Sequence, residues 1–251
     1  MRKAYRITEW NLNNRGKKMN YDKNKILIFS YDDGVTQDER MIEILNRYGI
    51  KGTFNINSEL LSQPGELIRE GKKISHNKVK PEDVRRIYAG HEVAGHTLTH
   101  PRLPTTKDDE EIIRQVEEDR KNLSELAGYE VTSFAYPCGG VNNDERVARL
   151  IKNHTGIKNA RTITSTYSFT PPKNIYRLNP TVSLYDDEER AFELAHKFVK
   201  MVTSKPKVFF VWGHSFEFDI NDSWDRFEEF CALLGGRDDI CYTTASALNQ
   251  D

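Results

Sequence analysis

An α/β fold built on a parallel sheet is predicted by three features of this 251-residue sequence. Short apolar runs alternate with amphipathic segments about seven times, as in sheets whose strands are joined by helical crossovers. The runs are apolar at consecutive positions, which is typical of strands buried on both faces. A length of about 250 residues is common among barrels that fold as one unit. An open doubly wound sheet and a (β/α) barrel both satisfy this pattern.

The first strand and its helix follow a polar N-terminal stretch. The apolar run ILIFSY at residues 26–31 predicts a buried strand. An amphipathic helix is expected at 37–48, and Thr36 with Glu39 resembles a capping box at its start. Gly49 is placed to end this helix, because glycine adopts the left-handed backbone of a helix C-terminus without steric cost.

The later elements continue the alternation. Strands are expected at residues 51–56 and 91–96, and a long helix from Thr106 to Gly128 has apolar side chains on one face, with Asp109 as the partner of Thr106 in a second capping box. The remaining strands are expected at residues 132–136, 159–165, 207–212 and 240–242, and the remaining helices at 143–153, 188–202 and 224–234.

Composition excludes several classes of partner. The net charge is -1 with acids and bases interleaved, so neither nucleic acid nor a membrane surface is an expected partner. Three cysteines without a CxxC pair argue against a disulfide framework. Residues 1–24 are expected to be a polar extension, and residues 25–251 a catalytic domain. No signal-peptide or transmembrane run occurs, which favours a cytoplasmic location. The oligomeric state is not predicted.

Acidic and histidine side chains follow the ends of the predicted strands. Asp32 and Asp33 follow the first strand, the segment HTLTHP begins at His96, and the segment WGHS contains His214. Because the carboxyl ends of parallel strands share one rim, these residues are expected to converge there.

His96 and His100 are candidate metal ligands. Gly95 and Pro101 bracket the pair and disfavour a regular helix across it, so a loop wrapped around an ion is preferred to a helical HxxxH site. Two imidazoles need an anionic third ligand to form an open metal site. Of two adjacent carboxylates, one could bind the ion while its neighbour accepts a proton from water. The competing interpretations are histidines bonded to backbone carbonyls and a solvated Asp-Gly turn.

His214 suits the opposite role, protonation of a leaving amine or alcohol. A lone histidine after a strand is more often structural than catalytic, and that alternative stays open.

Four segments together resemble the polysaccharide deacetylase family, carbohydrate esterase family 4 or NodB homology, over about residues 25–245. They are SYDDG, HTLTHP, FAYPCG and WGHS, and they occur in the family's order. The resemblance implies a deformed (β/α) barrel with about seven parallel strands and the removal of acetyl groups from sugars. It also implies a divalent metal ion, commonly zinc, with cobalt, nickel or manganese as alternatives.

The resemblance also implies a role for each matching residue. Asp33, His96 and His100 would be the metal ligands. Asp32 would be the catalytic base and His214 the general acid. The remaining contacts would be made by the backbone N–H of Cys138 at the developing oxyanion, by Tyr136 and Pro137 shaping the groove, and by Trp212 flanking the acetyl pocket.

Two departures from the family pattern stand out. Ala135 occupies the place of an arginine that usually steadies the base, and the usual Asp-Trp motif, whose aspartate pairs with the acid histidine, is absent. Arg161 on a neighbouring strand is expected to replace the arginine, against the alternative of an ordinary surface or ion-pair arginine. Glu217 or Asp219 is expected to orient the imidazole of His214.

The resemblance predicts a hydrolase that deacetylates an N-acetylated sugar or oligosaccharide. An O-acetyl carbohydrate esterase is the nearest alternative. A haloacid-dehalogenase-type phosphatase would need Asp-x-Asp, whereas Asp32 and Asp33 are adjacent. A decayed sugar-binding protein would not need the acid and base groups that this chain retains. The loops 57–80 and 165–186 are expected to determine the substrate.

Overall fold

The structure is a computed structural model that describes residues 23–249, so nearly all of the extension predicted at 1–24 lies outside it. The strands of the main sheet are β1 (Lys25–Asp32), β2 (Gly52–Ile56), β5 (Glu92–Gly95), β6 (Ser133–Ala135), β7 (Asn159–Arg161), β8 (Val182–Ser183), β9 (Lys207–His214) and β10 (Ile240–Thr243). The helices are α1 (Asp38–Arg47), α2 (Val84–Ile87), α3 (Asp109–Ala127), α4 (Glu145–His154), α5 (Glu188–Lys200), α6 (Glu217–Ile220) and α7 (Trp224–Leu234). A separate hairpin is formed by β3 (Glu66–Arg69) and β4 (Lys72–Ser75).

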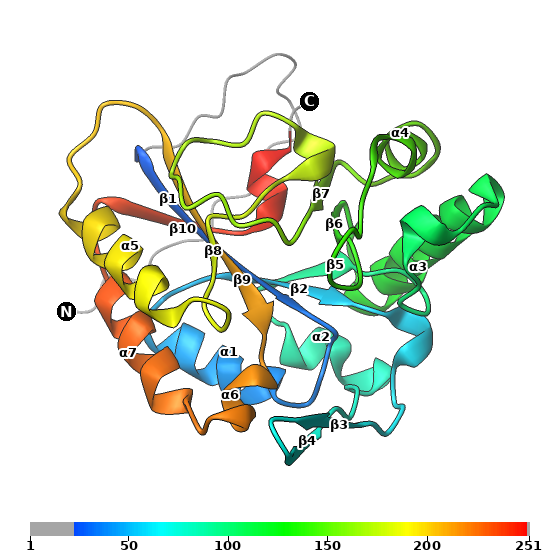
Figure 1. Cartoon of the computed structure of the whole chain (residues 1–251), viewed down its shortest axis with the longest axis horizontal. Coiled ribbons are helices and arrows are strands. Elements are labelled where there is room, and N and C mark those ends of the chain that lie inside the picture. Colours follow the sequence, from blue (N-terminus) through cyan, green and yellow to red (C-terminus); the bar gives the residue numbers. More distant parts are fainter. Residues whose placement is uncertain (1–22, 250–251) are drawn as a thin grey trace.

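The main sheet is entirely parallel and curls into a deformed barrel with helices on its outside (Figure 1). Its strand order is β7-β6-β5-β2-β1-β9-β8, and β10 pairs with the first half of β1. The predicted (β/α) barrel is confirmed, the strand expected at 240–242 is present as β10, and β8 is added to the expected strands. Among the described residues, no helix is long and apolar enough to cross a membrane.

Strand β1 lies at the centre of the sheet, and its side chains alternate between the barrel interior and the surrounding helices. Ile26 and Ile28 pack inside the barrel with Phe210 of β9. Phe29 and Tyr31 face outward and contact aromatic side chains of α7. The same alternation therefore directs Ser30 and Asp32 into the barrel.

One segment closes the barrel between β7 and β9. Leu178 pairs with β7, because its N–H donates to the carbonyl of Ala160 at 2.8 Å and its carbonyl accepts from Thr162 at 2.8 Å. A few residues later, Val182 and Ser183 pair with β9. The strand predicted at 159–165 is shorter than expected and ends at Arg161, after which the chain leaves the sheet.

Both predicted capping boxes are wrong. Gln37 is the N-cap of α1 and makes no side-chain capping bond. Helix α3 is capped by Asp108, whose side chain accepts from the N–H of Glu110 at 3.0 Å. The C-terminal glycines are as expected, since Gly49 and Gly128 have φ of 67° and 81°. Five short elements, β3, β4, β8, α2 and α6, were not predicted, because their two to four residues show neither a helical or strand period nor an apolar run.

Replacement of Leu178 with alanine tests the closure of the barrel. Leu178 is 0% exposed and packs inside the barrel, so Leu178→Ala should lower the free energy of unfolding by about 2–5 kcal/mol. Chemical denaturation measures this change. Val202→Ala is the control, because Val202 is 99% exposed and its truncation should leave stability unchanged. A stability equal to that of the wild type would mean that this segment does not hold the barrel closed.

Candidate active site

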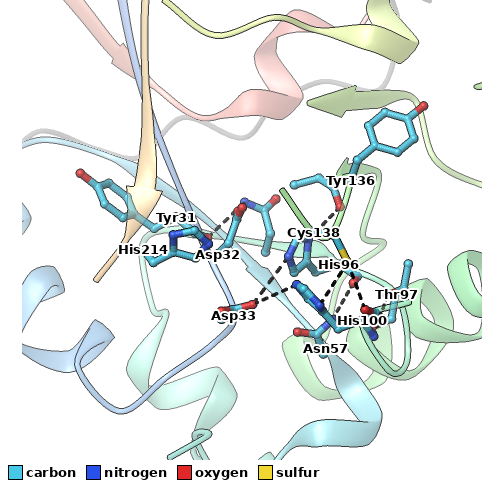
Figure 2. Close-up of polar contacts among 12 residues, drawn as sticks. Tyr31, Asp32, Asp33, Asn57, His96, Thr97, His100, Tyr136, Cys138 and His214 are labelled. Atoms are coloured by element: carbon cyan, nitrogen blue, oxygen red, sulfur yellow. Dashed lines mark hydrogen bonds and ion pairs between the residues drawn. The ribbon is translucent and has the colours of Figure 1, made fainter. Parts of the chain in front are cut away.

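The predicted residues converge at the carboxyl ends of β1, β5, β6 and β9. Figure 2 shows Asp32 and His214 on one side of this rim and Asp33, His96 and His100 on the other. Asp32 and His214 are direct neighbours across β1 and β9. The expectation that these residues lie close together at the strand ends is therefore confirmed.

Asp33, His96 and His100 form a cluster suited to a metal ion. One ligand atom of each lies within 4.8 Å of the others, and no further group of this kind occurs among the described residues. Asp33 Oδ1 lies 3.7 Å from Nε2 of His96 and 3.6 Å from Nε2 of His100. This oxygen is buried and has no hydrogen-bond partner in the described structure.

The donor set fits a divalent ion of the zinc type. Two imidazole nitrogens and one carboxylate leave a position open for water or substrate. The Nδ1 atom of His96 lies 2.8 Å from the carbonyl of Ala135, so its Nε2 is left to face Asp33. A cation between the three groups would also satisfy the unpartnered oxygen of Asp33, which is otherwise unfavourable to bury.

The backbone around this cluster adopts unusual conformations. Asp33, Thr97, His100 and Cys138 have φ of 84°, 71°, 60° and 71°, in the left-handed region that non-glycine residues seldom adopt. Such conformations are concentrated at functional sites and persist where surrounding contacts hold them.

Two buried polar side chains hold the loop that carries the histidines. Asp119 of α3 accepts hydrogen bonds from the N–H of His96 at 2.9 Å and of Ser58 at 2.8 Å. Asn57 donates its amide to the carbonyls of His96 at 2.6 Å and Thr97 at 3.0 Å. Both backbone polar groups of His96 are therefore held by buried side chains, which fixes the position from which its side chain extends.

Asp32 is buried in the barrel and remains ionised. It is 2% exposed and accepts from the Asn55 amide at 2.8 Å and from Arg161. Burial acts to raise the pKa of Asp32, but the positive charge of Arg161, with smaller contributions from His96 and His214, holds this pKa below its ordinary value. A carboxylate that stays charged near water is suited to accept a proton.

Arg161 reaches Asp32 from the strand next to Ala135. Ala135 and Arg161 are paired across β6 and β7, so an arginine at either position can extend into the same part of the barrel. The Arg161 guanidinium also donates to Ser30 at 3.0 Å and lies 4.9 Å above the ring of Trp212. Arg161 is 1% exposed, so it is not a surface arginine.

Glu217 is the partner of His214. The Nδ1 atom of His214 lies 2.8 Å from Oε1 of Glu217, whereas Asp219 instead accepts from Gln37 and Trp224. Burial acts to lower the pKa of His214, but the Glu217 carboxylate outweighs it and the pKa is raised to about 10. The imidazole is therefore protonated at neutral pH and can donate a proton.

Cys138 places its backbone N–H at the rim. Among the described residues, none accepts a hydrogen bond from this N–H, and the thiol lies 3.6 Å from the carbonyl of His100. That Tyr136 shapes the groove stays a prediction. Its side chain is 1% exposed and its hydroxyl donates to the Tyr176 carbonyl at 2.7 Å, so its ring lies beneath the surface. Figure 2 shows the ring directed away from the histidines. Pro137 is also buried, beneath the rim.

Trp212 lies in the barrel beside Arg161 and His214. It is 7% exposed, and its indole N–H is buried without a partner in the described structure. Its ring centroid is 5.9 Å from that of His214. A position flanking the acetyl pocket remains a prediction.

His76 and Lys78 were missed from the sequence. The Nε2 atom of His76 lies 3.0 Å from Oδ2 of Asp33, and the Lys78 ammonium donates to the Asp33 carbonyl at 2.8 Å. They line a cavity of about 230 Å³ with Asp33 and His100. Both follow the β3–β4 hairpin in the loop 57–80, where no motif indicated a contact with the site.

The sequence is similar to a known protein family and to curated members of it. The family model described as polysaccharide deacetylase matches residues 20–160, more than half of the 251 residues. That segment includes the cluster of Asp33, His96 and His100 but ends before Arg161 and His214. Among curated proteins, the chain is similar to the peptidoglycan-N-acetylglucosamine deacetylase PgdA of Listeria monocytogenes serotype 1/2a, with 27% identity over 122 residues. The match covers 47% of this chain and only 22% of that protein.

Solved structures show the same fold. A polysaccharide deacetylase, named as putative, from Mycobacterium smegmatis has a TM-score of 0.62 with 16% identity and covers 89% of this chain and 88% of that one. A family 4 carbohydrate esterase from Streptomyces lividans in complex with acetate has a TM-score of 0.55 with 14% identity and covers 87% of this chain and 92% of that one. At these identities the likeness establishes the barrel and its topology.

Replacement of Glu217 tests the cause of the raised pKa of His214. In Glu217→Gln the negative charge that stabilises the imidazolium is lost, so the pKa of His214 should fall from about 10 toward neutrality. NMR titration of the imidazole in metal-free protein measures the shift. Asp219→Asn is the matched control and should leave this pKa near its wild-type value. An unchanged midpoint in Glu217→Gln would remove Glu217 as the cause.

Proposed function

The chain belongs to the polysaccharide deacetylase family, and from this premise we propose that it is a metal-dependent hydrolase that removes acetyl groups from an N-acetylated saccharide. The observation that carries the proposal is the buried Oδ1 of Asp33, which has no hydrogen-bond partner in the described structure and lies 3.7 and 3.6 Å from the Nε2 atoms of His96 and His100. A phosphatase of the haloacid-dehalogenase type, considered from the strand and Asp-rich turn alone, is wrong because the chain belongs to this other family.

Asp33, His96 and His100 would hold the ion, most simply zinc. When bound there, a divalent ion acts as a Lewis acid toward water and the acetyl carbonyl. The histidines bind as neutral imidazoles, and burial favours this form by lowering the pKa of His96 to about 4 and that of His100 below its ordinary value. Cobalt, nickel or manganese would suit the same donors less specifically.

Asp32 takes the proton of the attacking water. Its carboxylate lies beside the cluster and is bound by Asn55 and Arg161, so its second oxygen can face the rim. Arg161 holds the carboxylate in place and keeps it ionised, which preserves its capacity to accept a proton. Arg161 on β7 therefore takes the role of the arginine that the family pattern places at position 135, where this chain has alanine.

The backbone N–H of Cys138 would donate to the oxyanion that develops on the acetyl oxygen, because no group among the described residues accepts a hydrogen bond from it. His214 protonates the leaving nitrogen of the sugar. The proton that Asp32 took from the attacking water then returns through solvent to His214, which restores both groups. Glu217 fixes the ring of His214 and favours the imidazolium. Water adds across the amide bond, and acetate and the free amine leave.

An N-acetylated saccharide is the favoured substrate class. The similar Listeria monocytogenes protein is named as a peptidoglycan-N-acetylglucosamine deacetylase, although the match covers a small part of it. The cavity beside Asp33 and His100 is lined by residues of the loop 57–80, which would contact the sugar. An O-acetyl ester would use the same base, ligands and acid, and remains the alternative substrate.

Acetate release tests the proposed function. The purified chain should release acetate from N-acetylglucosamine oligomers and lose this activity when a chelator removes its metal. Zinc should restore it, because the ligand set is retained. Acetylated xylan run in parallel distinguishes O- from N-deacetylation. Acetate release that survives complete metal removal would contradict the proposal, and saccharide binding without any release would instead support a decayed binding protein.

Replacement of Arg161 tests its contribution to the base. Arg161→Ala should lower kcat by about 10²-fold or more, because Asp32 loses its main charged partner and its position, while the metal content stays constant. Metal analysis and steady-state kinetics on the same sample measure both quantities. Arg177→Ala is the control, since Arg177 bonds Asn143 and Glu145 away from the base. Wild-type kinetics in Arg161→Ala would exclude Arg161 from the mechanism.

A further inference from the structure

His76 belongs to none of the sequence motifs, yet it contacts a proposed metal ligand. Its Nε2 atom lies 3.0 Å from Oδ2 of Asp33. We propose that His76 is a positioning residue that fixes the Asp33 carboxylate for metal binding and couples the β3–β4 hairpin to metal occupancy. This inference rests on the proposed metal site and is tested independently of deacetylation.

Three of the four polar atoms of Asp33 are hydrogen-bonded, and the fourth, Oδ1, is not. Its N–H donates to the Asn55 carbonyl at 2.9 Å, and its carbonyl accepts from Lys78 at 2.8 Å. Oδ2 is bonded to His76, whereas Oδ1 has no hydrogen-bond partner in the described structure and has the Lys78 ammonium 3.9 Å away. The contact with His76 therefore determines which carboxylate oxygen is presented to the ion.

His76 does not belong to the ligand set itself. The cluster whose donor atoms all lie within 4.8 Å of one another contains Asp33, His96 and His100, and His76 falls outside it. Its ring nitrogen is bonded to the opposite oxygen of the carboxylate. This is the arrangement of an outer partner that orients a ligand by hydrogen bonding.

Asp33 needs such a partner because its backbone is unusual. With φ of 84°, the residue lies in the left-handed region, which is unfavourable for a non-glycine residue and is maintained by surrounding contacts. Without His76, the carboxylate could rotate about its side-chain bonds and turn Oδ1 away from the histidines.

The ring of His76 is itself held by apolar packing. The ring lies edge-on to Phe216, with centroids 5.1 Å apart, and the backbone N–H of His76 donates to the Gly65 carbonyl at 2.8 Å. Ile74 of β4 is buried in a cluster with Phe216 and Val35. Ile74 thus fixes the hairpin two residues before His76. Because the position of His76 is fixed, its bond to Asp33 can hold the carboxylate in place.

Metal affinity measures this role directly. Zinc affinity of the full chain is determined by competition with a chromophoric chelator for wild type, His76→Ala, His76→Gln and His196→Ala. His76→Ala should bind zinc about 10–100-fold more weakly, the usual effect of losing an outer partner. His76→Gln keeps an N–H donor and should recover part of the affinity. His196 is exposed on α5, so its alanine variant should match wild type.

Two further readouts separate positioning from other roles. In the cobalt-loaded protein, His76→Ala should keep the wild-type visible bands, whereas changed bands would mean that His76 binds the ion and would overturn the proposal. In amide hydrogen exchange, zinc should increase protection of β3–β4 in wild type more than in His76→Ala. Loss of hairpin protection in the metal-free variant would indicate a general folding role and would also overturn it.

The remaining outcomes are distinguishable. Equal zinc affinity in wild type and His76→Ala would overturn the role of His76 alone. Absence of metal binding by the wild type would overturn both this inference and the metal-dependent function. Metal binding that depends on His76 in a chain that releases no acetate would support the inference while contradicting the deacetylase.

Discussion

Two consecutive carboxylates lie buried at the end of β1, and each needs its own compensating charge, because an unpaired buried ion is strongly unfavourable. Strand alternation directs Asp32 into the barrel, where Arg161 lies, and the left-handed backbone of Asp33 turns its carboxylate to the other side, toward His96 and His100. This separation allows neighbouring residues to perform different tasks. Asp32, the proposed base, is bonded to Arg161, and Asp33 presents Oδ1, which has no hydrogen-bond partner in the described structure, to the proposed metal position.

The charged partners of Asp32 and His214 come from positions other than those where the family pattern would place them. Arg161 pairs across the sheet with Ala135 and reaches the base from one strand farther along. Glu217 contacts His214 from the following helix, three residues later in the chain. The proposed chemistry requires a guanidinium beside the base and a carboxylate beside the acid. The strand or helix that provides each group is secondary.

The longer strands of the main sheet could be predicted from the sequence because buried parallel strands leave apolar runs, and β1 and β9 are the clearest examples. The groups at strand ends could be placed because parallel strands share one rim. His76 and the buried orientation of Tyr136 could not be predicted. Their positions depend on how the loop 57–80 folds back and on which face of a three-residue strand points inward, and neither leaves a periodic signal.

The central position of β1 has a consequence for how the chain acquires its structure during synthesis. Asp32 and Asp33 are made early, but β9 and β10, which flank β1, and the segment that closes the barrel at Leu178 are made late. Contacts so distant in sequence form slowly, because the intervening chain must first be ordered. Until then one edge of β1 and the part of the other edge that β2 does not cover stay unpaired, and the nascent chain depends on other means to avoid association through them.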